Sequence, residues 1–197
     1  MAKPLVVIFA RAPLYGAVKT RLARDIGAAE AIRFYRRTLF GLVLRLARDP
    51  RFETVIAATP DGAVTAGIWP KQARVTGQGD GDLGRRMMRV LKSAGARPAV
   101  VIGSDIPGIT ASQMNSAFRA LGRAPFVLGP ARDGGYWLIG ARHPSRLRLE
   151  TLDCVRWSSA TTMRETIDRL GSVEVLPQVL DDVDDGEAFR RIATRAR

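Results

Sequence analysis

The chain has 197 residues, 46% of them hydrophobic and 25% charged, and its formal net charge is +12 at pH 7. This length suffices for one domain, residues 1–197, with a core that needs no disulfide, and the one cysteine, Cys154, excludes an internal disulfide. Because no apolar run reaches the roughly 18 residues of a membrane span and no signal-peptide layout is present, we expect a cytoplasmic protein.

The positive charge comes almost entirely from arginine, with 27 Arg against 4 Lys. The arginines are spread along the chain, which favours solvated helix faces over one binding patch for a polyanion. Neither zinc-ligand spacing nor an RNA-binding aromatic motif accompanies them, so nucleic acid is not the expected partner. The sequence carries no signal for an oligomeric state.

Residues 5–10 form an apolar run that predicts a first buried strand, and residues 11–20 follow as a loop. The end of this loop, Gly16-Ala17-Val18-Lys19-Thr20, is similar to the end of a Walker A loop. However, no glycine precedes Gly16 in the chain, so the leading glycine of that motif is absent. An ordinary P-loop is therefore not predicted.

The same loop nevertheless has the composition of a phosphate site. Arg11, Lys19 and Arg21 are suited to bind a triphosphate or pyrophosphate through charge-assisted hydrogen bonds, and Gly16 permits close approach to the backbone. The alternative is a solvated basic turn.

A helix over residues 28–47 is predicted from apolar side chains at helical spacing, with arginines on the opposite face. Residues 54–59 are predicted to form a second strand, which a Pro-Asp-Gly turn ends. The stretch over residues 63–76 indicates a short third strand at best.

The glycine-rich segment over residues 77–84 permits backbone conformations and close approach that side chains would prevent. Gln78 offers a paired donor and acceptor that suit the edge of a nucleobase. A helix then runs to about residue 94, with Asp82 near its start. The alternative is a flexible turn in which Asp82 only caps the helix.

Residues 99–102 predict the central buried strand, which ends in Gly-Ser and then Asp105. Ligands of open α/β sheets bind just past the carboxyl ends of strands, and a carboxylate there suits a divalent metal such as Mg²⁺. The alternative is that Asp105 caps the next helix, which begins near Thr110 and covers residues 112–121.

Two more strands are predicted, over residues 124–130 and from Tyr136 to residue 140, with a tight turn between them. Such a turn makes a mixed sheet plausible. We expect Asp133, Gly134, Gly135 and Tyr136 to shape an acceptor pocket beside Asp105. The alternative for the aromatic residues is a place in the core.

The last part of the chain is predicted to contain a helix over residues 160–170, capped by Ser158 or Ser159, and a strand over residues 173–176. Five acidic residues then follow within seven positions, 181–187. This cluster either caps a terminal helix over residues 187–196 or completes a metal site with Asp105.

Six segments in this order resemble one bacterial family, selenodomain-associated transferase 1. They are FARAPLYGAVKTRLA, GQGDGDLGRRM, GSDIPGIT, GPARDGGYWLIG, VRWSSATTM and DVDDGEAF, and the resemblance covers residues 5–192. That family is glycosyltransferase-like and belongs to the GT-A, or nucleotide-diphospho-sugar transferase, superfamily, which also includes nucleotidyltransferases.

The resemblance implies a Rossmann-like α/β/α sandwich of three layers on a mixed, mainly parallel sheet. Asp105 resembles the superfamily's metal-binding Asp, and Asp184 resembles the late Asp that supplies a second carboxylate for Mg²⁺ or Mn²⁺. Arg11, Lys19 and Arg21 correspond to phosphate-binding positions. Gln78 and Gly81 correspond to positions that recognise the base.

We therefore expect a Mg²⁺-dependent transferase in which Lys19 and Asp105 are the catalytic residues. The reaction that the resemblance favours is glycosyl transfer from a nucleotide sugar to a small acceptor. The first alternative is a nucleotidyltransferase that joins an NTP to a phosphorylated acceptor and releases pyrophosphate. The second alternative is a protein that binds nucleotide or nucleic acid without catalysis.

Overall fold

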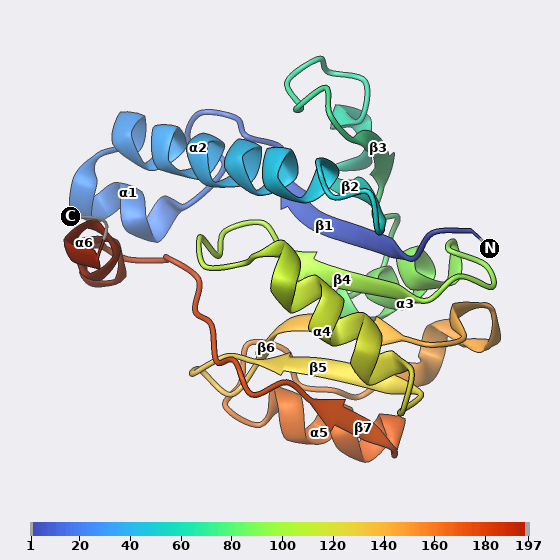
Figure 1. Ribbon diagram of the computed structural model, residues 1–197. Coiled ribbons are helices and arrows are strands. Elements are labelled where there is room, and N and C mark those ends of the chain that lie inside the picture. The colour runs from blue at the N-terminus through green and yellow to red at the C-terminus, as the bar shows by residue number, and fades with distance from the viewer. Residues whose placement is uncertain (1, 196–197) are drawn as a thin grey trace.

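A mixed sheet of seven strands in the order β3-β2-β1-β4-β6-β5-β7 runs through the computed structural model, which describes residues 2–195 (Figure 1). Strands β1 to β4 are mutually parallel, whereas β6 runs antiparallel to both β4 and β5, and β7 is parallel to β5. The strands are β1 (Leu5–Arg11), β2 (Glu53–Thr59), β3 (Arg74–Gly77), β4 (Ala99–Gly103), β5 (Phe126–Pro130), β6 (Tyr136–Ala141) and β7 (Val173–Val175).

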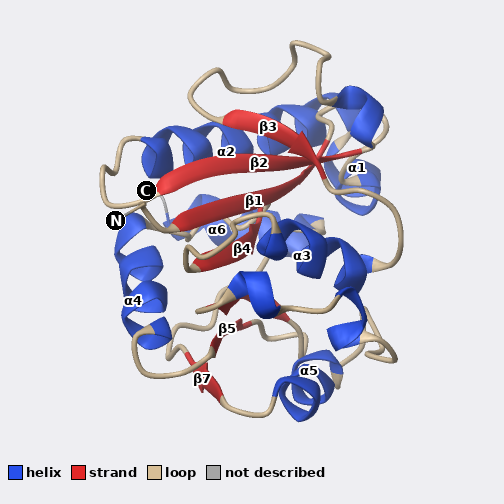
Figure 2. Cartoon of the chain, turned by 90° about the vertical axis from the view of Figure 1, so that its right-hand side faces the viewer, coloured by secondary structure: helices blue, strands red, loops and turns tan. Residues whose placement is uncertain are grey.

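Helices cover both faces of the sheet, α2 and α4 on one face and α3 and α5 on the other (Figures 1 and 2). The helices are α1 (Thr20–Ile26), α2 (Ala28–Ala47), α3 (Leu83–Lys92), α4 (Ala111–Leu121), α5 (Thr162–Leu170) and α6 (Gly186–Arg195). The predicted three-layer α/β fold with a mixed, mainly parallel sheet is thus confirmed. None of the described helices has the length and hydrophobicity needed to cross a lipid bilayer.

The alternation of side chains along β1 explains why its sequence is apolar throughout. Val6 and Ile8 pack in the core under α2 and α4, while Leu5 and Val7 pack in the core under α3. Because a central parallel strand is buried on both faces, its sequence does not alternate between apolar and polar residues.

Two local predictions were wrong. The loop predicted after β1 ends earlier than expected, because α1 begins at Thr20 and is separated from α2 only by Gly27, with φ +85°. Neither Ser158 nor Ser159 is the N-cap of α5, which is Thr161, without a capping hydrogen bond from its side chain. The predicted terminal helix is α6, and residue 196, its expected end, lies outside the described residues.

One edge of the sheet collects the loops that carry the predicted site. The carboxyl ends of β1, β4 and β5 lie at this edge, and so does the amino end of the antiparallel strand β6. The extended segment over residues 176–185 returns to the same edge, because Leu180 N donates to Pro130 O at 3.2 Å and Trp137 Nε1 donates to Gln178 O at 3.0 Å.

Helix α6 follows this segment and lies beside α1 (Figure 1). It packs on α1 and α2, with the rings of Phe34 and Phe189 in an edge-to-face contact whose centroids lie 5.3 Å apart. The acidic residues that precede α6 are thereby placed beside the first loop.

The turn between β5 and β6 is clamped to the start of α5. Gly134 O accepts a hydrogen bond from Met163 N at 2.9 Å, and Gly134 has φ +84°. A Cβ atom on Gly134 would overlap the backbone carbonyl of Ala160, whereas a Cβ on Gly135 would meet only Asp133 Oδ1 at 3.1 Å. Of the two glycines, Gly134 is therefore the one whose lack of a side chain the fold requires.

We expect Gly134→Ala to lower the free energy of unfolding by about 2 kcal/mol or more. The left-handed backbone contributes about 1 kcal/mol of this loss, and the clash with Ala160 contributes about 1–3 kcal/mol. Urea denaturation of Gly134→Ala and of the control Gly135→Ala measures the difference. Equal losses in the two variants would contradict this role of Gly134.

Candidate functional site

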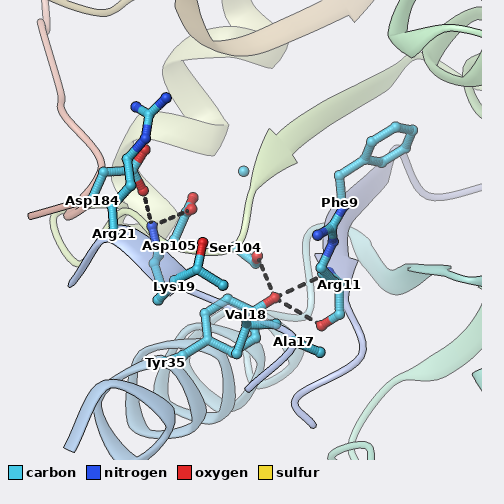
Figure 3. A pocket seen from close by; sticks show the side chains of 12 residues that line it. Phe9, Arg11, Ala17, Val18, Lys19, Arg21, Tyr35, Ser104, Asp105 and Asp184 are labelled. Atoms are coloured by element: carbon cyan, nitrogen blue, oxygen red, sulfur yellow. Dashed lines mark hydrogen bonds and ion pairs between the residues drawn. The ribbon is translucent and has the colours of Figure 1, made fainter. Parts of the chain in front are cut away.

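The ammonium of Lys19 lies between two carboxylates at the carboxyl edge of the sheet (Figure 3). Its Nζ is 2.7 Å from Asp105 Oδ2 and 2.5 Å from Asp184 Oδ1. The Lys19 side chain is only 4% exposed, whereas those of Asp105 and Asp184 are 30% and 48% exposed. A buried cation thus joins the first loop, the end of β4 and the acidic segment before α6.

The backbone of Lys19 adopts a left-handed conformation, with φ 52° and ψ 42°, at the N-cap of α1. For a residue with a side chain this conformation costs of order 1–3 kcal/mol. It is held by the hydrogen bond from Ala23 N to Lys19 O, at 2.8 Å, and by the two ion pairs of the side chain. Such strain at a charged, buried residue is typical of functional sites.

The neighbouring charges determine the protonation states of Lys19 and Asp184. Burial acts to lower the pKa of Lys19, but the attraction of Asp105 and Asp184 outweighs burial, so the pKa is raised and the ammonium stays charged. Burial acts to raise the pKa of Asp184, but the hydrogen bond and charge of Lys19 outweigh it, so this pKa is lowered.

Asp182 is a third carboxylate in the same cluster, and the sequence analysis did not single it out. One oxygen from each of Asp105, Asp182 and Asp184 lies within 4.8 Å of the other two. Burial and the negative charges of Asp184 and Asp105 raise the pKa of Asp182 to about 7. Three hard oxygen donors in this space, with one ammonium against them, suit a divalent cation such as Mg²⁺ or Mn²⁺.

The other acids of the cluster over residues 181–187 have structural partners. Asp181 accepts from Arg132 N at 3.0 Å and from Arg132 Nε at 2.8 Å. Asp185 accepts from Ala188 N at 2.8 Å in the first turn of α6. Asp185 therefore takes the helix-capping role, while Asp182 and Asp184 lie near Asp105 and their role as metal ligands stays a prediction.

The alternative role of Asp105 as a helix cap was wrong. Thr110 is the N-cap of α4 and forms a capping box with Gln113, in which Gln113 N donates to Thr110 Oγ1 at 3.4 Å and Thr110 N donates to Gln113 Oε1 at 2.6 Å. Asp105 is thus not used by the helix that follows it.

A cavity of about 350 Å³ opens beside Lys19, and we call it the basic cavity. Arg11 and Arg21 line it together with Lys19, Asp105 and Asp184, so the structure brings together five of the predicted site residues. Gly16, with φ +72°, precedes the lining residues Ala17 and Val18 without lining the cavity itself.

Tyr35 of α2 also lines the basic cavity, and the sequence analysis assigned it no part in the site. Its hydroxyl donates to Arg11 O at 2.9 Å, accepts from Arg11 N at 3.0 Å and accepts from the Ser104 hydroxyl at 3.1 Å (Figure 3). Burial raises the pKa of Tyr35, so the phenol stays neutral. Tyr35 therefore ties α2 to the ends of β1 and β4.

Gln78 and Gly81 line neither this cavity nor the second one described below. The Gln78 side chain is buried; its Nε2 donates to Ala57 O at 2.8 Å and its Oε1 accepts from Arg86 Nη1 at 3.1 Å. The amide thus fixes the glycine-rich segment to β2 and α3. The role of Gln78 and Gly81 in base recognition stays a prediction.

A second cavity, of about 260 Å³, also reaches Asp105. We call it the acceptor chamber after the acceptor pocket predicted here, whose role stays a prediction. Asp133, Gly135 and Tyr136 of the predicted acceptor pocket line it, while Gly134 instead forms the clamp to α5. The chamber shares Phe9, Gly103 and Asp105 with the basic cavity, and Asp182 lines it too.

The sequence analysis missed one wall of the acceptor chamber, which Trp157, Ser158 and Ser159 provide. These residues lie within one of the segments that carried the family resemblance, and that was their only signal. Trp157 packs closely on α3, because a Cβ on Gly84 would lie 2.7 Å from Trp157 Cζ2.

We expect Lys19→Met to lower stability at neutral pH by about 1–3 kcal/mol, because it leaves three carboxylates without their central cation. Mn²⁺ should then raise the Tm of this variant more than that of the wild type. Thermal unfolding with EDTA or MnCl₂ measures both effects, and Lys71→Met, at an exposed position, is the control. A loss no larger than the control's, or no added response to Mn²⁺, would contradict the arrangement.

Asp182→Asn should be more stable than the wild type at pH 8 and equal to it near pH 4, in a buffer with EDTA. The folded protein binds a proton on Asp182 up to about pH 7, whereas the carboxyl of the unfolded chain loses it near 3.8. Wild-type stability therefore falls as pH rises between these values, and asparagine removes this loss. Urea titrations at both pH values test the difference, with the exposed Asp168→Asn as control; a pH-independent difference would contradict it.

The chain is similar to several solved structures. A protein from Desulfovibrio desulfuricans G20, provisionally named a nucleotide-diphospho-sugar transferase, is 28% identical over 94% of this chain and 84% of that chain, with a TM-score of 0.82. Two more distant structures share the fold. They are Rv0371c from Mycobacterium tuberculosis H37Rv in complex with manganese (16% identity, 98% of both chains, TM-score 0.56), and CMP:2-keto-3-deoxy-manno-octonic acid synthetase in complex with CTP (15%, 99% of both chains, 0.57).

No curated protein matches the chain. A family model does match residues 42–159, which is more than half of the chain, and its description is "Uncharacterized protein conserved in bacteria (DUF2064)". The narrower name suggested by the six sequence segments stays a prediction. The chain therefore belongs to the DUF2064 family, and its fold is that of the nucleotide-diphospho-sugar transferases.

Proposed function

We propose that this protein is a transferase that uses a nucleotide donor and a divalent cation, and that its reaction is glycosyl transfer from a nucleotide sugar to a small acceptor. The observation that carries the proposal is the Lys19 ammonium held by Asp105 and Asp184 in a cavity that Arg11 and Arg21 also line. The likeness to the Desulfovibrio protein supports the transferase class. The manganese and CTP complexes of the distant structures agree with a cation and a nucleotide on this fold.

Asp105, Asp182 and Asp184 are the residues that would hold Mg²⁺ or Mn²⁺. When bound there, the cation would act as a Lewis acid that neutralises charge on the donor phosphates. The donor set fits this group, because all three ligands are carboxylates and one oxygen from each lies within 4.8 Å of the others.

Lys19 has a role of its own toward the donor. An ammonium has three N–H groups, and the two carboxylates use two of them, so the third is available to a phosphate oxygen. Arg11 and Arg21 add further donors around the same cavity. Together these cations stabilise the charge that develops on the leaving diphosphate, where one such donor contributes about 2.7–4 kcal/mol to lowering the barrier.

The acceptor would approach from the acceptor chamber, which meets the basic cavity at Asp105. Its hydroxyl oxygen forms a bond to the anomeric carbon of the donor sugar while the bond from that carbon to the diphosphate oxygen breaks. The nucleoside diphosphate leaves with the electron pair, and the hydroxyl proton is released to water. Holding both substrates at this junction supplies the remaining rate enhancement through orientation.

Nucleotidyl transfer is the second candidate, and the basic cavity is the observation in its favour. Three cationic side chains suit the triphosphate of an NTP, which carries more negative charge than a nucleotide sugar. In that reaction a phosphorylated acceptor attacks the α-phosphate, and pyrophosphate leaves. Binding of nucleotide without turnover is the outcome that would assign the protein to the non-catalytic class.

Incubation with Mg²⁺ or Mn²⁺ and a panel of nucleotide sugars and NTPs tests the proposal. We expect release of nucleoside diphosphate from a nucleotide sugar, and release of pyrophosphate would identify the nucleotidyl alternative. Lys19→Met should lower kcat about 10²–10³-fold, whereas Lys71→Met, at an exposed position, is the matched control. Failure of every nucleotide to give a metal-dependent thermal shift would overturn both enzyme assignments.

A further inference from the structure

The acceptor chamber differs in charge from the basic cavity, although the two meet at Asp105. Lys19, Arg11 and Arg21 line the basic cavity. The described residues that line the acceptor chamber include no Lys, Arg or His, and its charged residues are Asp105, Asp133 and Asp182. The boundary between the cavities is therefore a boundary between positive and negative surroundings.

Three arginines that flank the chamber in sequence have carboxylate partners, and a fourth, Arg86, donates through Nη1 to Gln78 Oε1 at 3.1 Å. Arg132 pairs with Asp181 at 2.8 Å, Arg156 with Glu165 at 2.5 Å, and Arg85 with Asp153 at 2.8 Å. An arginine in an ion pair already shares its charge and some of its N–H donors with a carboxylate, so it attracts a phosphate in the chamber less strongly. With a cation on Asp105, Asp182 and Asp184, as proposed, a phosphorylated acceptor would find no cationic side chain among the lining residues. It would instead meet the carboxylate of Asp133, and like charges at close range disfavour binding.

The rest of the lining suits an uncharged molecule with one apolar face. Leu83 and Met87 of α3 and the ring of Trp157 form an apolar wall. An aromatic ring in such a wall can stack on the apolar face of a sugar ring, while a few polar groups fix its orientation.

Ser158 provides a polar group on the same wall. It has φ 55°, an uncommon conformation for a residue with a side chain, and its hydroxyl makes no hydrogen bond within the described part of the chain. Asp133 adds a carboxylate on the opposite turn, where Oδ1 accepts from Gly135 N at 2.9 Å and leaves Oδ2 for a ligand. Both are suited to the hydroxyl groups of a ligand.

We infer that the acceptor chamber binds a hydroxylated molecule without negative charge, of the sugar class, and that it discriminates against the phosphorylated form of the same molecule. The inference rests on the proposed function and deepens it. Within that function it selects glycosyl transfer over nucleotidyl transfer to a phosphorylated acceptor.

The test uses the full chain with Mn²⁺ and the nucleotide that gives the largest thermal shift. Calorimetric titration of this complex compares free monosaccharides with their phosphates. We expect the free sugars to bind at least tenfold more tightly than the phosphates. Tighter binding of the phosphates, or no binding of either series to protein that binds the nucleotide, would overturn the inference. Failure of the nucleotide itself to bind would instead overturn the proposed function.

Variants at the wall of the chamber locate the site. Ser158→Lys places an ammonium at an exposed position of the lining, so it should strengthen binding of the phosphates at least tenfold, and Ser158→Gln, of similar length without charge, should not. Trp157→Ala should weaken sugar binding about tenfold while nucleotide affinity stays unchanged, which also shows that the variant is folded. Equal loss of nucleotide affinity would mean that the chamber holds part of the donor, and would overturn the inference.

Discussion

The arrangement depends on one electrostatic constraint, which is that a single buried ammonium holds two carboxylates that are distant in sequence. Lys19 meets Asp105, 86 residues away, and Asp184, 165 residues away. The left-handed start of α1 and the docking of α6 on α1 and α2 both serve this meeting, since each fixes one end of an ion pair. Without this ammonium, the carboxylates of Asp105, Asp182 and Asp184 would face one another with no opposite charge between them.

Charge separates the two halves of the site. The cavity on the side of β1 presents cations, whereas the chamber on the side of β6 presents carboxylates and apolar rings, and Asp105 belongs to both. In the proposed glycosyl transfer this division would suit the two substrates, because the diphosphate of the donor carries negative charge whereas the acceptor is uncharged. The sheet supplies the division by placing an antiparallel strand next to β4.

Much of the fold was predictable because helices and strands follow from the local spacing of apolar residues. The helix over residues 28–47 follows from the spacing of its apolar residues, and Asp105 stands out as a carboxylate at the end of a buried strand. The role of Tyr35 was not predictable, because the position of a tyrosine on an apolar helix face does not show which strand ends its hydroxyl contacts. The place of Asp182 near Asp105 was not predictable, because the directions of neighbouring acidic side chains depend on the backbone conformation of the segment. Trp157 required knowledge of how α3 and the start of α5 approach each other.

The order of the chain has a consequence for how the protein matures. Asp182 and Asp184 come from the extended segment after β7, so every strand of the sheet precedes them in synthesis. A nascent chain can thus contain every strand of the sheet and Lys19, yet it lacks two of the three clustered carboxylates until the segment after β7 has been synthesised. Under the proposed function, three carboxylates could hold a cation only after this segment has docked on the completed sheet.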